Sequence, residues 1–241
     1  MAPLISTVDV SKRYGALVVL DSVSFELDPG QVVGIVGPNG AGKTTLLDIL
    51  AGAGRPDRGT VSFSGRDVTR LGAADRCRLG IGRTHQIPRP FVDMTVFENA
   101  LVGANQGARL RGRAARDRAL DALSATGMLE LGNRRADTLG LLDRKRLELA
   151  RAVATAPSVL LLDEIAGGLT EAETDVLIAQ VRALRSRGIA IVWIEHVVRA
   201  LLQVAERLVC LDAGRVIAAG EPQAVMRDPV VIEAYLGSAA A

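Results

Sequence analysis

Hydrophobic positions follow one pattern before residue 95, a second one up to residue 156, and a third one after it. In the first part, apolar residues alternate with polar ones over short stretches such as 18–27, which predicts half-buried strands. Residues 95–156 are rich in Ala, Leu and Arg and have the apolar spacing of amphipathic helices. The run 158–164, up to its two final carboxylates, and the run 189–194 are almost continuously apolar. They predict strands that are buried on both faces of a parallel sheet.

Turn residues and helical spacing predict the remaining elements. A helix should run to about Leu50, and a further strand should lie near 60–65. We expect another helix over 171–187, a hairpin over 207–218 and a helical tail over 222–236. This order predicts an α/β fold. An antiparallel, β-rich N-terminal layer should cover a parallel-sheet core, and a helical subdomain should be inserted into that core.

Composition and charge fit a single folded domain. The 241 residues are 49% hydrophobic and 23% charged, and the net charge of +2 gives no strong attraction to nucleic acid. No apolar run reaches the roughly 18 residues that a membrane-spanning helix requires. The first residues have no charged segment ahead of an apolar one, so no secretory signal is predicted. We expect one domain over residues 1–241, a cytoplasmic location and no nucleic acid partner.

The strongest chemical signal is the loop that follows the apolar residues 32–36. It fits Gly-x-x-x-x-Gly-Lys-[Ser/Thr] at every fixed position, between a predicted strand and a predicted helix, as this pattern requires. Its glycines let successive backbone N–H groups surround a phosphate, and Lys43 adds a positive charge for the β- and γ-phosphates. The hydroxyl of Thr44 is placed to bind Mg²⁺. The residues expected to bind ATP here are Gly37, Pro38, Asn39, Gly40, Ala41, Gly42, Lys43, Thr44 and Thr45.

Two carboxylates, Asp163 and Glu164, end the buried run 158–164. A carboxylate at the end of a core strand needs a partner, and a Mg²⁺ ion shared with Thr44 would supply one to Asp163. Glu164, one residue further along, suits a base or a positioning group for the attacking water. The alternative is an acidic pair that only caps a neighbouring helix. Beside the loop 37–45, the pair favours nucleotide hydrolysis.

With these motifs, the chain resembles the ATP-binding subunits of ABC transporters over essentially its whole length. Residues 160–164 are similar to that family's Walker B motif, and residues 83–86 to its Q-loop. The resemblance implies that Gln86 contacts Mg²⁺ or the attacking water, that His196 contacts the γ-phosphate, and that Tyr14 stacks on adenine. Each of the three also has a structural alternative: a surface loop glutamine, a buried structural histidine and a tyrosine that only packs. The implied catalytic residues are Glu164, His196 and Gln86, and the implied metal-binding residues are Thr44, Asp163 and Gln86.

The resemblance is tightest to importers of branched-chain and other hydrophobic amino acids, of the LivG type. It rests on residues 83–86 and 91–99 and on the tail 228–237. It implies a P-loop NTPase fold of the ABC type, with the helical subdomain over about 95–156. It also implies an ATPase that uses ATP and Mg²⁺ to power a membrane importer, for branched-chain amino acids or related small solutes.

The same resemblance implies partners and a location. The expected partners are a second ATP-binding subunit, identical or different, transmembrane permease subunits and, indirectly, a periplasmic solute-binding protein. The expected location is the cytoplasmic face of the bacterial inner membrane, where the chain would be a peripheral subunit. The sequence does not name the transported solute, because the permease and the solute-binding protein would select it.

One element departs from the family pattern. The family's signature, usually Leu-Ser-Gly-Gly-Gln, should fall at residues 139–143, which here read Leu-Gly-Leu-Leu-Asp. In the family this loop crosses a dimer and touches the γ-phosphate held by the partner. Gly140 lacks the hydroxyl donor, and Asp143 adds a negative charge near that phosphate. We expect either a weakened signature beside an intact P-loop, so that the two ATP sites of a heterodimer differ, or a tolerated variant with normal activity.

Two other functions fit parts of the sequence. A soluble ABC-type ATPase in cofactor assembly or repair would have the same site. Such proteins usually carry long coiled-coil insertions or linked nucleic-acid domains, which the sequence lacks. A cofactor-assembly ATPase of single-domain size is nevertheless compatible with this architecture. A P-loop kinase would need an acceptor pocket and a lid, and the combination of Gln86, Glu164 and His196 favours the ATPase instead.

Overall fold

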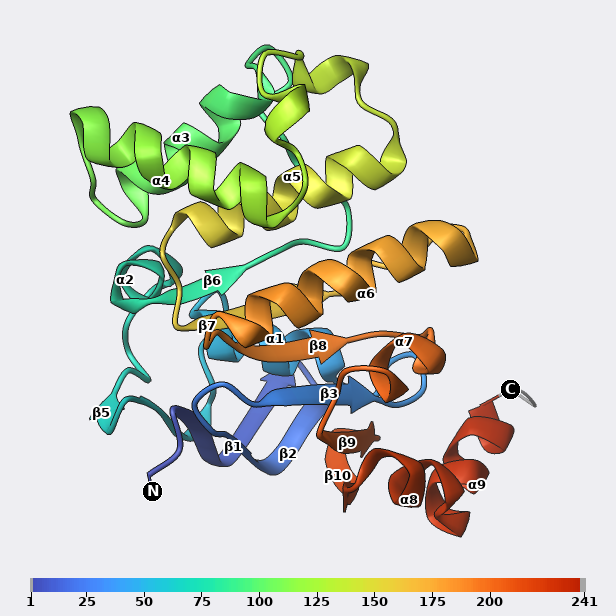
Figure 1. Cartoon of the computed structure of the whole chain (residues 1–241). Coiled ribbons are helices and arrows are strands. Elements are labelled where there is room, and N and C mark those ends of the chain that lie inside the picture. The colour runs from blue at the N-terminus through green and yellow to red at the C-terminus, as the bar shows by residue number, and fades with distance from the viewer. Residues whose placement is uncertain (1, 239–241) are drawn as a thin grey trace.

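Two sheets pack on either side of helix α1 (Lys43–Ala51) at the centre of the molecule (Figure 1). The structure is a computed structural model that describes residues 2–238. Within these residues, the larger sheet has six strands in the order β10-β9-β3-β8-β7-β6, and the smaller has four in the order β2-β1-β4-β5. The strands of the larger sheet are β3 (Val32–Val36), β6 (Ile81–Arg83), β7 (Val159–Asp163), β8 (Ala190–Ile194), β9 (Arg207–Asp212) and β10 (Arg215–Gly220). Those of the smaller sheet are β1 (Ile5–Tyr14), β2 (Leu17–Leu27), β4 (Arg58–Phe63) and β5 (Arg66–Asp67).

The larger sheet is the predicted parallel core. Its strands pair in parallel, except that β10 is antiparallel to β9, as expected for the hairpin over 207–218. Every residue of β3, β7 and β8 is buried, which confirms the strands expected from the continuous apolar runs. The smaller sheet is antiparallel, as predicted for the N-terminal layer.

Each face of the larger sheet lies in its own hydrophobic core. Along β3, Val33 and Ile35 join the core that contains α1 and the smaller sheet. Val32 and Val36 join the core on the other face, which the remaining large helices cover. Side chains of a strand alternate between its two faces, so the sheet is fixed between these two layers.

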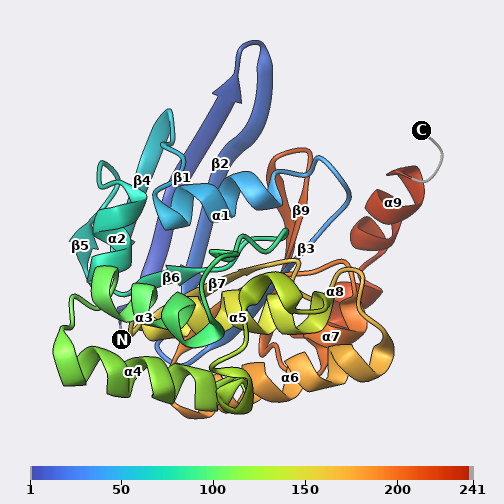
Figure 2. The same cartoon turned by 90° about the horizontal axis from the view of Figure 1, so that it is seen from above.

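The helical segment forms a layer of its own, at the top of Figure 1. It consists of α3 (Val96–Gln106), α4 (Gly112–Ala125) and α5 (Leu141–Ala154), which pack against one another, and it confirms the helical spacing of residues 95–156. Thr95 begins α3 with a capping box: its hydroxyl accepts from the Glu98 N–H, and the Glu98 carboxylate accepts from the Thr95 N–H. Figure 2 shows that β1 and β2 project on the opposite side of the molecule from α4.

The other helices differ in part from the prediction. They are α2 (Ala73–Leu79), α6 (Glu171–Ser186), α7 (Val198–Leu202), α8 (Pro222–Arg227) and α9 (Pro229–Ser238). The predicted tail helix is two helices, because Pro229 cannot continue a helix and Asp228 before it is extended, with φ −65° and ψ 125°. Patterning did not predict α2, β6 and α7, which are too short for a clear period. No helix within residues 2–238 has both the length and the apolar character of a membrane span.

Candidate functional site

The loop 37–45 joins β3 to α1 and borders a cavity of about 200 Å³. The N–H groups in the first turn of a helix have no partner inside the helix, and the first turn of α1 has no acidic residue. This end of α1 therefore suits an anion. The cavity is lined by Val19, Asn39, Gly40, Ala41, Gly42, Lys43, Thr44, Thr45, Glu164 and His196.

Two positions in this loop require glycine. Gly37 has φ 143°, and a Cβ there would lie 2.0 Å from the carbonyl oxygen of Leu211. Gly42 has φ 100°, and a Cβ there would lie 2.6 Å from the carbonyl oxygen of Val19. Both clashes are with backbone atoms, which cannot turn away as a flexible side chain can. The spacing of the motif thus follows from how closely β2 and β9 approach the loop.

Lys43 is buried and folds back onto its own loop. Its Nζ donates hydrogen bonds to the carbonyl oxygens of Gly37, at 2.7 Å, and Pro38, at 2.9 Å. Burial lowers the pKa of the Lys43 ammonium, and the nearby Glu164 carboxylate acts in the opposite direction. The positive charge is therefore held at the cavity by groups that a phosphate could replace.

Glu164 lies one residue beyond β7 in a left-handed conformation, with φ 45°. This conformation is unfavourable for a residue with a side chain, and such strain is typical of functional sites. One carboxylate oxygen of Glu164 lies 2.8 Å from Nε2 of His196, and the other accepts a hydrogen bond from Nε2 of Gln86. The structure thus brings together the three residues expected to act in catalysis.

The surroundings of Gln86 and His196 distinguish between the roles proposed for them. The His196 side chain is 45% exposed at the cavity, so the buried structural histidine is wrong. Gln86 is exposed, as the loop glutamine would be, but it is hydrogen-bonded to Glu164. Its side chain therefore has a defined place in the site.

Asp163 is buried at the end of β7, and only part of its carboxylate has a partner. Its Oδ2 lies 3.2 Å from Nη2 of Arg83, whose Nη1 pairs with Asp48 of α1. Its Oδ1 is buried and has no hydrogen-bond partner among the described residues. Burial raises the pKa of Asp163, and the Arg83 guanidinium opposes that effect. We expected Mg²⁺ to be the partner of this carboxylate, but Arg83 already pairs with one of its two oxygens.

Sequence reasoning missed three charged side chains around Glu164 and Asp163. Besides Arg83, Lys145 of α5 places its Nζ 3.4 Å from the carbonyl oxygen of Glu164. Glu195 is buried, and its Oε1 accepts hydrogen bonds from the N–H of Ala166 and from the Trp193 indole. Burial raises the pKa of Glu195. Glu195 had a signal in the sequence, because a carboxylate directly after a buried strand needs a partner.

Tyr14 lies apart from this cavity lining. It ends β1 opposite Leu17 and is 55% exposed, and the Nζ of Lys12 lies 5.4 Å from the centre of its ring. On the paired strand β2, Val19 does line the cavity. Tyr14 is thus a surface residue whose ring contacts Lys12, and its stacking on adenine stays a prediction.

The signature-like residues 139–143 form the start of α5. Gly140 is the N-cap, in an extended conformation with φ −70°, and it has no side chain to cap the helix. Asp143 lies in the first turn and is paired with Arg146 at 3.0 Å. Leu141 is 46% exposed. An acidic side chain thus already occupies the end of the helix that would attract a phosphate.

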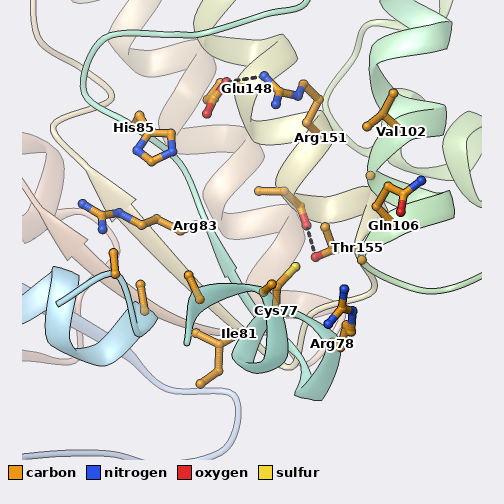
Figure 3. A pocket seen from close by; sticks show the side chains of 17 residues that line it. Cys77, Arg78, Ile81, Arg83, His85, Val102, Gln106, Glu148, Arg151 and Thr155 are labelled. Carbon is orange, nitrogen blue, oxygen red and sulfur yellow. Dashed lines mark hydrogen bonds and ion pairs between the residues drawn. The ribbon is translucent and has the colours of Figure 1, made fainter. Parts of the chain in front are cut away.

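A second cavity, of about 350 Å³, lies between the sheet core and the helical layer (Figure 3). Figure 3 shows Arg83 and His85 on one side of it and Val102 and Gln106 on the other. Glu148 and Arg151 of α5 lie on the wall and pair at 3.0 Å. Burial lowers the pKa of His85. The cavity is adjacent to Gln86, the next residue of the chain after His85.

Comparison with known proteins gives one consistent family. The model of the ABC transporter family matches residues 20–167, and that of the "Branched-chain amino acid ATP-binding cassette transporter" matches residues 215–241. LivG of Escherichia coli K12, named as a high-affinity branched-chain amino acid transport ATP-binding protein, is 37% identical over 98% of this chain and 99% of its own length. LptB of Acidithiobacillus ferridurans, named as a lipopolysaccharide export system ATP-binding protein, is 36% identical over 98% of each chain.

Solved structures of the same family have the same fold. A nucleotide-free ATP-binding cassette from an ABC transporter superposes with a TM-score of 0.89 at 30% identity, over 97% of this chain and 98% of the other. The ADP conformation of MJ1267, an ATP-binding cassette of an ABC transporter, gives a TM-score of 0.90 at 30% identity, over 98% and 100% of the two chains. The family match includes the loop 37–45 and the acids at 163 and 164. This chain is therefore a member of the ABC transporter family and belongs to its ATPases, which power transport.

Proposed function

We propose that the chain works as one nucleotide-binding domain over residues 1–241, with a helical subdomain over 95–156, and powers a membrane importer for branched-chain amino acids or related small solutes. The observation that carries the import assignment is the match of residues 215–241 to the branched-chain amino acid model. The relatives named LivG and BraF support it as well. The similarly close LptB relative is named for an export system, and the C-terminal match favours import for this chain.

In this proposal the phosphates of ATP occupy the cavity beside the loop 37–45. Lys43 leaves the carbonyls of Gly37 and Pro38 and neutralises the β- and γ-phosphates. The N–H groups of the loop and of the first turn of α1 donate to the phosphate oxygens. Tyr14 stacks on the adenine with its exposed ring.

Mg²⁺ would be held by Thr44, Asp163 and Gln86. The buried Oδ1 of Asp163 supports this group, because a buried carboxylate oxygen without a donor is a suitable cation ligand. Thr44 supplies a hydroxyl on the cavity wall, and Gln86 an amide oxygen, so all the ligands are oxygens. When bound, the ion neutralises charge on the β- and γ-phosphate oxygens.

Glu164 orients the attacking water and accepts its proton. Gln86 and His196 each contact one oxygen of that carboxylate, so they fix its direction. His196 lies on the cavity wall, where it also reaches the γ-phosphate once ATP is bound. The contacts support this division of roles, because Gln86 and His196 both meet the Glu164 carboxylate, and Glu164 and His196 line the cavity.

The complete site requires a second ATP-binding subunit, whose signature loop would reach the γ-phosphate bound here. This chain's own residues 139–143 would serve the partner's site in return. Because Gly140 offers no hydroxyl and Asp143 adds negative charge, we propose that the partner's site is the weaker one. The pair would then be a heterodimer with two unequal sites. A tolerated variant with normal activity is the competing possibility.

Permease subunits would dock at the second cavity, beside the helical layer. Its location supports this, because a segment seated against Arg83 and His85 would move the neighbouring Gln86 and so the Glu164 carboxylate. The chain would then lie on the cytoplasmic face of the bacterial inner membrane, and a periplasmic solute-binding protein would deliver the solute to the permease.

Reconstitution tests the proposal. The chain should co-purify with the membrane proteins encoded next to it. Proteoliposomes of the assembled complex should accumulate leucine only when ATP is enclosed in the vesicles, on the same side of the membrane as this subunit. The alternative is a soluble ATPase in cofactor assembly or repair. Robust ATP hydrolysis that is stimulated by DNA or ribosomes, without any membrane partner, would favour that alternative and end the transport proposal.

A further inference from the structure

The C-terminal helix contacts the nucleotide-binding loop directly. The hydroxyl of Tyr235, on α9, accepts a hydrogen bond from the backbone N–H of Gly37, with 2.8 Å between the two atoms. Gly37 is the first residue of the loop, and the two residues lie 198 positions apart in the chain. In Figure 1, α9 lies at the edge of the molecule, well away from the helical layer. No catalytic or metal-binding role assigned above uses this contact.

Helix α9 holds the Tyr235 hydroxyl in a fixed place. Val231, one turn earlier, is fully buried, and the carboxylate of Asp228 accepts from the Val230 N–H at 2.9 Å. The Tyr235 ring packs against the core on the helix-covered face of the larger sheet. Burial raises the pKa of the Tyr235 phenol, so the hydroxyl stays neutral at physiological pH. A neutral, positioned hydroxyl is a reliable acceptor for a buried N–H.

At the loop, two different side chains hold the two polar groups of Gly37. Tyr235 holds its N–H, and Lys43 holds its carbonyl at 2.7 Å. Lys43 must release that carbonyl, and that of Pro38, before it can reach a phosphate. Tyr235 can keep its bond during this exchange because it does not face the phosphate cavity.

Close packing does not replace the hydrogen bond on this side of the loop. A cavity of about 470 Å³ lies between the loop and α9, with Pro38 and Asn39 on one side and Glu233 on the other. Gly37 itself is buried, so its N–H would lose a partner if the hydroxyl were removed. The hydrogen bond from Gly37 to Tyr235 therefore holds the backbone in place at the start of the loop.

We propose that Tyr235 is a positioning residue for ATP binding. It fixes the first N–H of the loop, so that the loop keeps its phosphate-binding shape while Lys43 changes partners. It acts through Gly37 and touches no substrate. The proposal rests on the proposed binding of ATP in this loop, and it links the C-terminal helix to nucleotide affinity.

The test compares Tyr235→Phe, which removes only the hydroxyl, with the native chain and with Ile232→Ala. Ile232 lies on the same helix and is 45% exposed, so its truncation leaves the contact intact. Three quantities are measured: calorimetric affinity for ATP with Mg²⁺, amide hydrogen exchange of residues 32–42, and the melting temperature without nucleotide. Tyr235→Phe should weaken ATP binding about three- to tenfold, as expected for one lost hydrogen bond at a partly buried group. Exchange should become faster in residues 32–42 only, and the melting temperature should fall by no more than about 4 °C, as expected for one lost hydrogen bond.

Two results would overturn the proposal. One is an unchanged ATP affinity together with unchanged exchange in residues 32–42. The other is faster exchange throughout the chain with a large fall in melting temperature, which would make the hydroxyl a general packing contact. If the native chain itself fails to bind ATP, the proposed nucleotide function fails, whereas the exchange of residues 32–42 still decides whether Tyr235 holds the loop.

Discussion

Two helix N-termini of this protein look alike in outline and differ in chemistry. Helix α1 begins after Gly42 and α5 begins after Gly140, and neither glycine caps its helix with a side chain. The first turn of α1 has no acidic residue, and it borders the cavity beside Lys43. The first turn of α5 contains Asp143, paired with Arg146. One helix end is therefore open to an added anion, and the other already has an anion of its own.

The two glycines differ as well. Gly42 has φ 100° and close backbone neighbours, whereas Gly140 has φ −70° and no atom within 4 Å of an added Cβ. The first position is thus limited to glycine by geometry, and the second accepts any residue. The loop 37–45 is therefore constrained by its surroundings, whereas nothing around Gly140 requires a glycine there.

Substitution of Glu164 tests whether ATP is hydrolysed at the site beside α1. Glu164→Gln removes the base but keeps an oxygen and a similar shape, so phosphate release should fall about a hundredfold or more. ATP affinity should stay within about threefold, because Glu164 is not among the phosphate-binding groups. Phosphate-release kinetics and calorimetry give the two numbers. The control is Glu171→Gln, the same change at an exposed residue of α6. Equal activity of both variants would remove Glu164 from the mechanism.

The second prediction compares the two glycines directly. Gly42→Ala places a Cβ 2.6 Å from the carbonyl oxygen of Val19 at positive φ. It should lower the free energy of unfolding by about 2–4 kcal/mol. Gly140→Ser should change it by less than about 0.5 kcal/mol, because serine is as good an N-cap as glycine or better. Urea unfolding followed by circular dichroism measures both. Similar losses in the two variants would contradict the distinction between these helix ends.

A third experiment asks whether the start of α5 weakens the partner's site. Gly140→Ser with Leu142→Gly restores a hydroxyl donor and a family glycine, and should raise the ATPase turnover of the assembled complex about two- to tenfold. Gly140→Ala with Leu142→Gly is the matched control, since it lacks the donor. Turnover that stays the same or falls in the serine variant would support the tolerated-variant view.

The smallest effect concerns Glu195, which holds the N–H of Ala166 in the loop after Glu164. Burial raises the pKa of Glu195 above its ordinary value of 4.5. The folded chain therefore keeps this proton to higher pH than the unfolded chain. The contribution of Glu195 to the free energy of unfolding is complete below pH 4.5 and is lost as the pH rises through the raised pKa.

Glu195→Gln keeps an oxygen that can accept from Ala166 but does not titrate. Relative to the native chain, the variant should gain stability as the pH rises from 4.5 through the raised pKa of Glu195, by an amount on the order of 1 kcal/mol. Urea unfolding at several pH values measures this difference, with Glu130→Gln, at an exposed residue, as the control. A difference between variant and native chain that does not change with pH would show that Glu195 keeps an ordinary pKa.

Local sequence patterns were enough to predict the loop 37–45, the buried strand that ends at Asp163, and the parallel core with its helical segment. Each of these follows from local rules: glycines where backbone atoms must approach closely, continuous apolar runs for buried strands, and helical spacing over 95–156. The role of Glu164 followed from its place after a buried strand, and those of Gln86 and His196 from the family resemblance. The fold then brought Gln86 and His196 into contact with the Glu164 carboxylate.

The side chains that support that site could be identified only once the chain was folded. Arg83 pairs with Asp163 from 80 positions away, Glu195 holds Ala166 from 29 positions away, and Tyr235 reaches Gly37 across almost the whole chain. No period or motif in the sequence predicts such contacts, because they depend on where separate strands and helices end in space. These contacts contribute to stability because they are buried. A polar group in the core cannot form hydrogen bonds with water, so it must form them with other groups of the protein.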